Sequence, residues 1–457
     1  MTGASTGART RACRTLRCGR QPDASPAGGT SLLDLPNEII SHIIQHVAPL
    51  GGRKAESLRL VDRRISSLAS PFLFASLIIP DRSCEENDEL FSAILENRHG
   101  VVDVVTSFAY ISSEDHLVLR MPASVVGTLV NIQRVLLAGT SRCTIPNHFE
   151  TMLGRLPRLT TLILKNFNMT PTAQGSLLSR CAPRVRHLIL NDIRGSGVFN
   201  TRTRLNINNS LVESPGSDVE VLEVYKAGVG TTRSIYTLLH ACRSTVQHII
   251  MEWDGGIYFG QSVLSPYKIL SGAVKSMRLQ RLPDLFMSRS YKDHFDTSLA
   301  IIQLLEWVAS SPLHDLSLPV NRTFDVHPGL LRLSLPNVQK LSLSTCPSSE
   351  QDDLVDLLTP ETLPALTEFL TSIFPSLKTL HLVGWLDSSS LAYLATTPPP
   401  QLALQGSSLF TLLGVLKVIG SRKLVLETSN GHPDGEIKCI YELQGEWEWT
   451  VRLARYI

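Results

Sequence analysis

The stretches RLPRLTTLIL (residues 155–164) and CAPRVRHLIL (residues 181–190) share a pattern that returns through most of the chain. Each contains a hexad with apolar residues at its first, fourth and sixth positions, and each has a proline two residues ahead of that hexad. Proline ends a preceding helix and holds the chain extended as it enters the next element. We therefore expect each hexad to form a short strand whose three apolar positions point into a core.

The hexad occurs ten times, and successive copies start 25 to 39 residues apart. Two further copies, in SLPNVQKLSL (334–343) and IFPSLKTLHL (373–382), repeat the proline lead-in. This recurrence resembles leucine-rich repeats, whose period is about 20–29 residues, and the longer gaps fit insertions. The copies are Val105/Phe108/Tyr110, Ile132/Val135/Leu137, Leu159/Leu162/Leu164, Val185/Leu188/Leu190, Val219/Leu222/Val224, Val246/Ile249/Met251, Val274/Met277/Leu279, Leu313/Leu316/Leu318, Val338/Leu341/Leu343 and Leu377/Leu380/Leu382.

The segments between the hexads favour helices, and Thr231–Arg243 and Asp296–Ser310 are good examples. One strand–helix unit cannot bury its apolar face alone, so neighbouring units stack on each other. The expected fold is α/β: an irregular leucine-rich-repeat solenoid with parallel strands on its concave side and helices on its convex side. The alternative is an ordinary α/β domain with parallel strands, which alternates apolar runs and helices in the same way.

A second organising stretch precedes the repeats: LPNEIISHIIQHV (35–47) followed by SLRLVDRRISSLASPFLFASLII (57–79). Pro36 suits the first turn of a helix, where the missing N–H costs nothing, and Asp34 is placed to cap that helix. Ile39, Ile43 and Val47 follow one another at helical spacing. Together the two segments predict three helices, which are too small to form a large core of their own.

The motifs Leu35-Pro36-x-Glu38-Ile39-Ile40, Ile43-Ile44 and Leu60-Val61-x-Arg63-Arg64 resemble an F-box of the form common among fungal proteins. The resemblance implies helices that dock onto a Skp1-type adaptor within a cullin-based ubiquitin ligase. The sequence departs from the family at the long Gly51-Gly52 loop and at Ile65 and Phe74, where many members have tryptophan. A plain helical cap on a larger domain is the alternative. The expected adaptor contacts are Leu35, Pro36, Ile39, Ile43, Leu60 and Val61.

Composition narrows the function. The formal net charge is +2 over 457 residues, so nothing global indicates a nucleic-acid or membrane partner. No apolar run is long enough for a membrane span, and the N-terminus lacks the apolar region of a secretory signal. The eight cysteines lie apart without zinc-site spacing, which favours free, mostly buried thiols in a reducing compartment. We therefore expect a cytoplasmic or nuclear location, or both.

The motifs of common enzyme classes are missing. The sequence contains no P-loop, no GxSxG nucleophile elbow, no HExxH pair and no kinase signature set. Catalytic triads assemble from distant residues, so a hydrolase or transferase without a motif remains a third hypothesis. The prediction is that the chain is not an enzyme and uses no cofactor or metal.

The residues between the apolar positions of each hexad would point outward along the strand. On the expected concave face they mix histidines, charges and isoleucines, and Ile163, Ile189 and Ile250 are costly to leave in water unless something covers them. A partner surface and a cover of helices or insertions both explain them. The candidate target-binding residues are His187, Glu223, His248, Arg278, Asp315, Lys340 and His381.

We predict four segments along the chain: a disordered arginine-rich tail (1–31), an F-box-like helical domain (32–80), the repeats (81–395) and a small β-rich C-terminal cap (396–457). The cap is expected to contain strands at Lys423–Thr428, Glu436–Leu443 and Glu446–Leu453, after a helix at Leu409–Gly420. The predicted function is a substrate-recognition adaptor that joins a Skp1-like adaptor and its cullin complex to an unknown target protein. The alternative is a leucine-rich scaffold without a link to ubiquitination.

Overall fold

The structure is a computed structural model, and it describes the chain in separate ranges. These are residues 35–47, 62–73, 75–80, 84–97, 101–111, 123–139, 153–169, 184–195, 218–227, 239, 242–253, 272–281, 302, 304–320, 329–345, 358–386, 388–397, 401–402, 407–428, 436–444 and 448–456. The predicted tail, the Gly51-Gly52 loop, Leu60 and Val61 lie outside them. The chain divides into two compact units, residues 1–73 and 74–457, which we describe separately.

The first unit contains helices α1 (Asn37–Val47) and α3 (Arg63–Leu73). Ile40 and Ile44 are one turn apart on α1, and they pack with Ile65 and Ala69 of α3 in a small core. All four side chains are at most 2% exposed. The predicted amphipathic helices therefore form over these residues. Of the four isoleucines of α1, Ile40 and Ile44 fill the core.

Arg64 joins the two helices through hydrogen bonds. Its Nε donates to Asn37 Oδ1 at 2.6 Å, and its guanidinium also donates to the carbonyl of Leu35 at 2.8 Å. The Asp62 carboxylate accepts a hydrogen bond from the backbone N–H of Arg64 at 2.7 Å, in the position of an N-cap for α3. These contacts fix the start of α1 against the start of α3.

The predicted helical segment ends earlier than expected. Residues Ser76–Pro80 form strand β1 rather than helix, and β1 pairs in parallel with the next strand, so it belongs to the second unit. The predicted boundary after residue 80 is therefore wrong by several residues. The run SLIIP is compatible with either helix or strand by periodicity alone, and the sheet decides between them.

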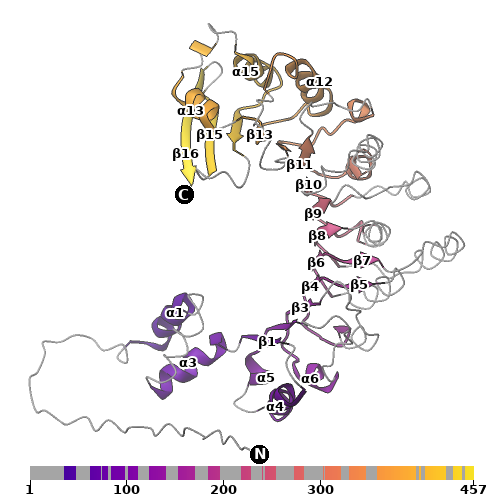
Figure 1. Ribbon diagram of the computed structural model, residues 1–457, viewed down its shortest axis with the longest axis vertical. Coiled ribbons are helices and arrows are strands. Elements are labelled where there is room, and N and C mark those ends of the chain that lie inside the picture. The colour runs from indigo at the N-terminus through magenta and orange to yellow at the C-terminus, as the bar shows by residue number, and fades with distance from the viewer. Residues whose placement is uncertain are drawn as a thin grey trace, which may run out of the picture. The chain divides into compact units, whose positions relative to one another are not determined.

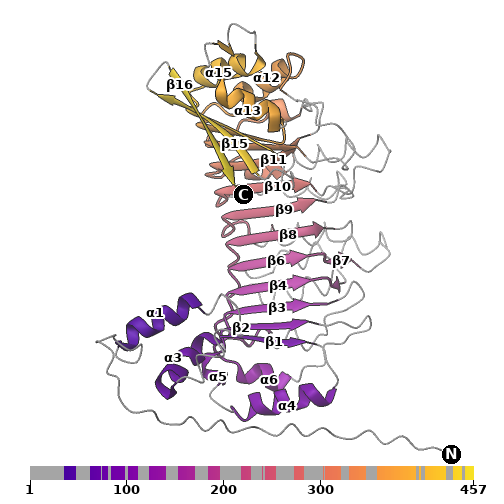
Figure 2. The ribbon, with the colours of Figure 1, turned by 60° about the vertical axis from the view of Figure 1, so that its left-hand side comes forward.

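The second unit is an α/β structure built on one open sheet of 14 strands (Figure 1). The strands follow one another in chain order as a ladder, and all neighbouring pairs are parallel up to β14 (Figure 2). The remaining strands of the sheet are β2 (Ser107–Ile111), β3 (Arg134–Ala138), β4 (Thr161–Lys165), β6 (His187–Asn191), β8 (Val221–Ala227), β9 (His248–Trp253), β10 (Ser276–Arg281), β11 (Asp315–Val320), β12 (Lys340–Thr345), β13 (Thr379–Val383), β14 (Lys423–Glu427), β15 (Glu436–Gln444) and β16 (Glu448–Tyr456). A separate two-stranded sheet joins β5 (Asn168–Met169) to β7 (Arg194–Gly195).

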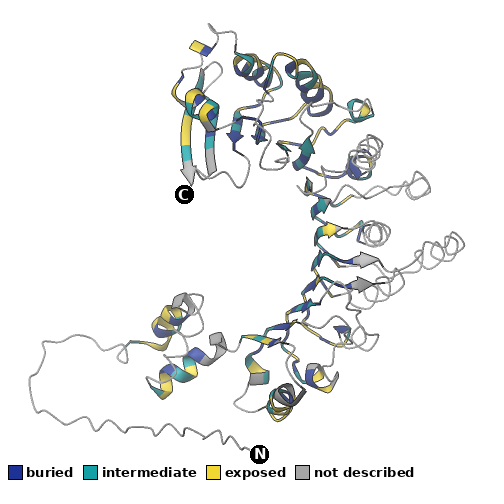
Figure 3. Cartoon of the chain, in the orientation of Figure 1, coloured by how far each residue is buried: buried dark blue, intermediate teal, exposed yellow. Residues whose placement is uncertain are grey.

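Every apolar position of the ten predicted hexads is buried, at most 7% exposed, and belongs to one continuous core. Along most of the strands these residues alternate with half-buried and exposed ones (Figure 3), whereas β2 and β4 also bury the outward residues Ala109 and Ile163. Of the expected helix at Asp296–Ser310, residues 304–308 are helical, and in Thr231–Arg243 only Leu239, Cys242 and Arg243 are described. Within the described ranges, the helices of this unit that have defined bounds are α4 (Cys84–Leu95), α5 (Val101–Val104), α6 (Ala123–Thr128), η6 (Leu330–Arg332), α12 (Leu363–Ile373), α13 (Ser388–Thr396) and α15 (Ser408–Val418).

The same turn follows several strands. Asn166, Asp192 and Gly384 each come directly after a strand and have positive φ angles of 59°, 50° and 72°. The backbone N–H of each donates to a carbonyl of the next parallel strand, at 2.8 to 2.9 Å. Asparagine, aspartate and glycine are the residues that adopt this conformation most readily. These three repeats therefore share a backbone turn as well as the apolar pattern.

The series of parallel strands extends beyond the last predicted hexad, because β14 pairs in parallel with β13. Leu424 and Leu426 occupy the fourth and sixth hexad positions, but the first position holds Ser421, which is fully buried. Of the described strands, β15 and β16 are the only ones added to the sheet in antiparallel orientation. They cover the end of the core, where the Tyr441 hydroxyl donates to the Leu394 carbonyl at 2.9 Å. The predicted cap therefore begins one repeat later than expected.

Candidate functional site

The seven residues predicted to bind a target all lie on the face of the sheet opposite its core, which we call the open face. They alternate with buried hexad residues along their strands. Because the strands pair without a shift at these positions, the residues fall into rows across the sheet. One row contains His187, Val221, His248, Ser276, Asp315 and Lys340, and the next contains Ile189, Glu223, Ile250, Arg278, Ser317, Ser342 and His381.

A hydrogen-bonded cluster spans β6 and β8. The Nε2 of His187 lies 2.7 Å from Glu223 Oε1, and the Tyr225 hydroxyl donates to Glu223 Oε2 at 2.6 Å. Burial, followed by the bond to the Glu223 carboxylate and its charge, raises the pKa of Tyr225 to about 12. Both carboxylate oxygens of Glu223 are therefore held by neighbours on the same face.

The other predicted residues of this region are also paired. His248 Nδ1 lies 2.8 Å from Ser276 Oγ, and Lys340 Nζ lies 3.0 Å from Asp315 Oδ2. Oriented with its oxygen toward Arg278, the Gln280 amide accepts from that guanidinium at 2.7 and 2.8 Å. The Lys340–Asp315 pair is 52% and 39% exposed, so we expect it to contribute at most about 1 kcal/mol to folding.

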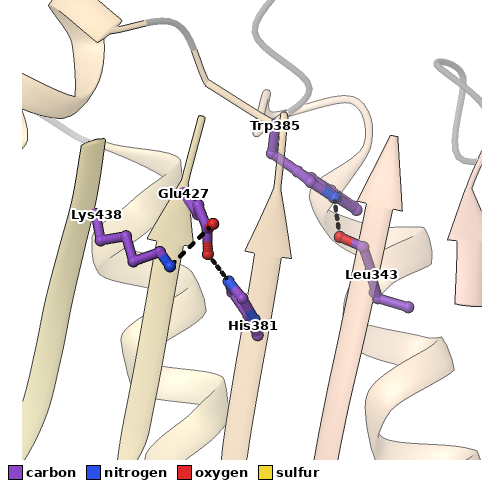
Figure 4. A network of polar contacts seen from close by, with 5 residues as sticks. All are labelled: Leu343, His381, Trp385, Glu427 and Lys438. Atoms are coloured by element: carbon purple, nitrogen blue, oxygen red, sulfur yellow. Dashed lines mark hydrogen bonds and ion pairs between the residues drawn. The ribbon is translucent and has the colours of Figure 1, made fainter. Parts of the chain in front are cut away.

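His381 forms a second cluster near the end of the sheet (Figure 4). Its Nε2 lies 2.6 Å from Glu427 Oε2, and Lys438 Nζ lies 3.1 Å from Glu427 Oε1. Burial opposes the charge of Glu427, but the hydrogen bonds to His381 and Lys438 outweigh it and hold the pKa of this carboxyl below its usual value of 4.5. The cluster joins β13, β14 and β15, so His381 has a structural partner as well as a place on the open face.

The open face of β1, β2, β3, β4 and β6 is mainly apolar. Its middle row contains Ile78, Ala109, Leu136, Ile163 and Ile189 on successive strands. Ile78 is 58% exposed and Ile111, in the adjacent row, is 42% exposed. Ile163 is only 9% exposed, and Ile189 and Ile250 are half-buried. Ile163 is therefore covered by the chain itself, which is one of the two explanations that the sequence leaves open.

The predicted adaptor contacts of the first unit divide into two groups. Pro36, Ile39 and Ile43 are exposed, the two isoleucines at 48% and 38%. Leu35 is half-buried and packs against the core of α1 and α3. Ile39 and Ile43 lie one turn apart on α1, directly beside Ile40 and Ile44 in sequence, and so form an exposed apolar pair next to a buried one.

Among the described residues, no group of three or more histidines, cysteines or acidic residues is arranged to hold a metal ion. None of the described helices combines the length and apolar character that a membrane crossing requires. Cys242 and Cys439 are free and buried, as predicted for the cysteines in general. Burial raises the pKa of these two thiols to about 12 and about 11, which favours the unreactive protonated form.

No protein-family model matches the chain, and no curated protein matches it significantly.

Sequence reasoning did not single out Tyr225, Glu427 or Lys438 as part of these clusters. Tyr225 lies two residues after Glu223 and therefore shares its face, so strand alternation alone points to it. Glu427 follows Leu426 in β14, and recognising β14 as one more repeat would have placed it on the open face. Lys438 comes from an antiparallel strand whose register the hexad pattern does not specify.

Proposed function

We propose that this chain is a substrate-recognition adaptor of an SCF-type (Skp1–cullin–F-box) ubiquitin ligase. On this proposal α1 and α3 belong to an F-box that binds a Skp1-type adaptor, and the sheet is a leucine-rich-repeat array whose open face binds a target protein. The chain then performs no bond chemistry itself. It raises the local concentration of the target beside the ligase.

One observation carries the proposal: the exposed pair Ile39 and Ile43. These side chains would gain by burial, because moving apolar surface out of water is favourable by about 25 cal/mol per Å². Apolar anchors at i and i+4 on an amphipathic helix are a common way for one helix to bind a groove or another helix. They stand at motif positions for which the F-box resemblance implies contact with the adaptor.

The open face supports the second half of the proposal. Polar and charged side chains on successive strands lie in register, so they form rows that a partner surface can contact in order. In repeat proteins such extended faces are the usual binding surfaces. This support is independent of the F-box resemblance, and it applies equally to a scaffold without a ligase.

The test is recovery of a Skp1 homologue from a cell lysate with the tagged full-length chain. We expect wild type to recover it and the double variant Ile39→Asp/Ile43→Asp to lose it. Both substituted residues are exposed, so the α1–α3 core stays intact. Leu35 makes a poorer test because it packs against that core.

The matched control is Ile78→Asp, which changes an isoleucine that is 58% exposed in the second unit. It should recover the homologue as wild type does. Failure of wild type to recover any Skp1 homologue, or equal recovery with the double variant, would exclude the ligase role. The second candidate, a leucine-rich scaffold, would then be the better account, since the open face supports it without α1.

A further inference from the structure

We propose that the target segment bound by this chain is extended and carries both apolar and acidic side chains, and that it binds the open face of β1, β2, β3, β4 and β6. We call this region the N-terminal patch. The inference deepens the proposed function, because it rests on the sheet being the target-binding surface. It names the chemistry of the occupant and the half of the sheet that holds it.

The apolar part of the N-terminal patch is continuous across five strands. Ile78, Ala109, Leu136, Ile163 and Ile189 are in-register partners from β1 to β6. In the neighbouring row Ile111 pairs with Ala138. Ile78 is 58% exposed and Ile111 is 42% exposed, so both side chains leave apolar surface that a partner can cover. A partner with apolar side chains therefore gains by lying along these rows.

Two cations flank this apolar row on opposite sides. Arg134 is in-register with Ser107 and Thr161, and Lys165 is in-register with Ala138 and Asn191. Both side chains are exposed, and neither makes an ion pair with another described residue. None of the outward positions of these five strands holds an acidic residue. The patch is therefore apolar in the middle and positive at its edges, which favours an occupant with carboxylates beside its apolar side chains.

The rest of the open face differs in this respect. From β8 onward the rows contain acidic residues, and the charges largely satisfy one another. Glu223 is held by His187 and Tyr225, and Asp315 is held by Lys340. An acidic segment would have to displace these contacts to bind there. Charge complementarity therefore selects the N-terminal patch over the later strands.

The dimensions fit a short extended segment. Neighbouring strands lie about 4.8 Å apart, so a row across five strands spans roughly 19 Å. An extended chain rises about 3.3 Å per residue, and roughly six residues cover that distance. Successive side chains of such a segment alternate in direction, so some reach the apolar row while others reach the flanking cations.

Selection of peptides on the purified full-length chain tests this proposal without knowledge of the target. The probe is a displayed library of random 12-residue peptides. We expect the selected peptides to be enriched in Asp and Glu together with Leu, Ile and Phe. Binding of the selected peptides should weaken by about tenfold or more in Arg134→Glu/Lys165→Glu and in Ile78→Asp/Ile111→Asp.

Two control variants match these substitutions elsewhere in the second unit. Arg278→Glu reverses an exposed cation on the later part of the open face, and Val418→Asp changes a valine of α15 that is 85% exposed. Both should bind the selected peptides as wild type does. In addition, a selection on Arg134→Glu/Lys165→Glu should favour basic rather than acidic peptides. Thermal unfolding of each variant confirms that it is folded.

Several results would overturn the inference. These are selected peptides without acidic enrichment, peptides that depend on Arg278 rather than on Arg134 and Lys165, and a selection that yields no binder sensitive to the patch variants. The ligase role is tested separately through Ile39 and Ile43, and patch variants should still recover the Skp1 homologue. A failed recovery with a successful selection would therefore exclude the ligase and leave the patch assignment standing.

Discussion

Ser421 is a buried residue whose side-chain hydroxyl has no hydrogen-bond partner. It occupies the first hexad position of β14, where the other repeats have an apolar residue. An unsatisfied buried polar group costs about 1–3 kcal/mol, so Ser421→Ala should raise the free energy of unfolding by about 1 kcal/mol. Denaturant unfolding of the full chain measures this.

Thr345→Val is the matched control for Ser421→Ala. It also removes a hydroxyl, but the Thr345 hydroxyl donates to the Gly384 carbonyl at 2.8 Å. This variant should lower the free energy of unfolding by about 1 kcal/mol, because a hydrogen bond that is present in the folded chain is lost. A loss of stability in Ser421→Ala similar to that in Thr345→Val would contradict the assignment of Ser421 as unsatisfied.

Glu427 gives the fold a dependence on acid pH. Its pKa is lowered in the folded state, so its contribution to stability is complete above the usual value of 4.5 and is lost as the pH falls through the lowered value. The side chain of Glu427→Gln cannot titrate. This variant should lower the free energy of unfolding at pH 7 by about 1–3 kcal/mol, because a neutral amide forms weaker hydrogen bonds with His381 and Lys438 than the carboxylate does.

The difference in unfolding free energy between wild type and Glu427→Gln should shrink as the pH falls below 4.5. Urea unfolding at a series of pH values checks this. Glu368→Gln serves as the control, because that carboxylate is exposed on α12 and makes no ion pair with another described residue. A difference in unfolding free energy between wild type and Glu427→Gln that stays constant from pH 7 to the lowest pH measured would contradict this role of Glu427.

At the scale of residues, the sequence predicts which side chains lie on the open face but not how they pair. Strand alternation places His187, Glu223 and His381 correctly. The pairs His187–Glu223 and His381–Glu427 each join a residue to one on the next strand, one row further along. Such diagonal contacts depend on strand register and on side-chain conformation, and neither is encoded in a pattern within one repeat.

At the scale of elements, α1 offers the sharpest comparison, between the adjacent residues Ile39 and Ile40. Ile40 is 1% exposed and Ile39 is 48% exposed. Ile40→Ala should lower the local unfolding free energy of α1 and α3 by about 2 kcal/mol or more, because it leaves a cavity in a small core. Ile39→Ala should change it by less than about 0.5 kcal/mol.

Hydrogen exchange of peptides from residues 35–47 and 62–73 measures these two effects separately from the rest of the chain. Exchange of both helices should accelerate in Ile40→Ala, because each depends on the shared core. Peptides from β11 and β12, in the second unit, are the internal control and should not change. Equal acceleration in Ile39→Ala would mean that Ile39 is part of the core rather than of a docking surface.

The elements that could be predicted are those with a complete hexad. All ten predicted hexads became strands with buried apolar residues because the pattern reflects a single physical requirement, a shared core between stacked units. The sequence predicts β14 as a strand but not as a repeat, because Ser421 interrupts the hexad pattern. For β1 the sequence predicts a helix, because a short apolar run between elements fits both periods.

At the scale of the whole molecule, two units offer two chemically different surfaces. The first unit presents Ile39 and Ile43 on a helix, and the second presents an open face that is apolar and positive over its first strands and internally paired over its later ones. An adaptor needs two such independent surfaces, since it must bind the ligase and the target at the same time. The residues that define them do not overlap, so variants can separate the two roles.

The most direct test of the proposed role is a calorimetric titration of the purified full-length chain with a purified Skp1-type adaptor. The account predicts saturable binding with one adaptor per chain, lost in Ile39→Asp/Ile43→Asp and unchanged in Ile78→Asp. No binding by folded wild type, or binding that survives in Ile39→Asp/Ile43→Asp, would contradict it.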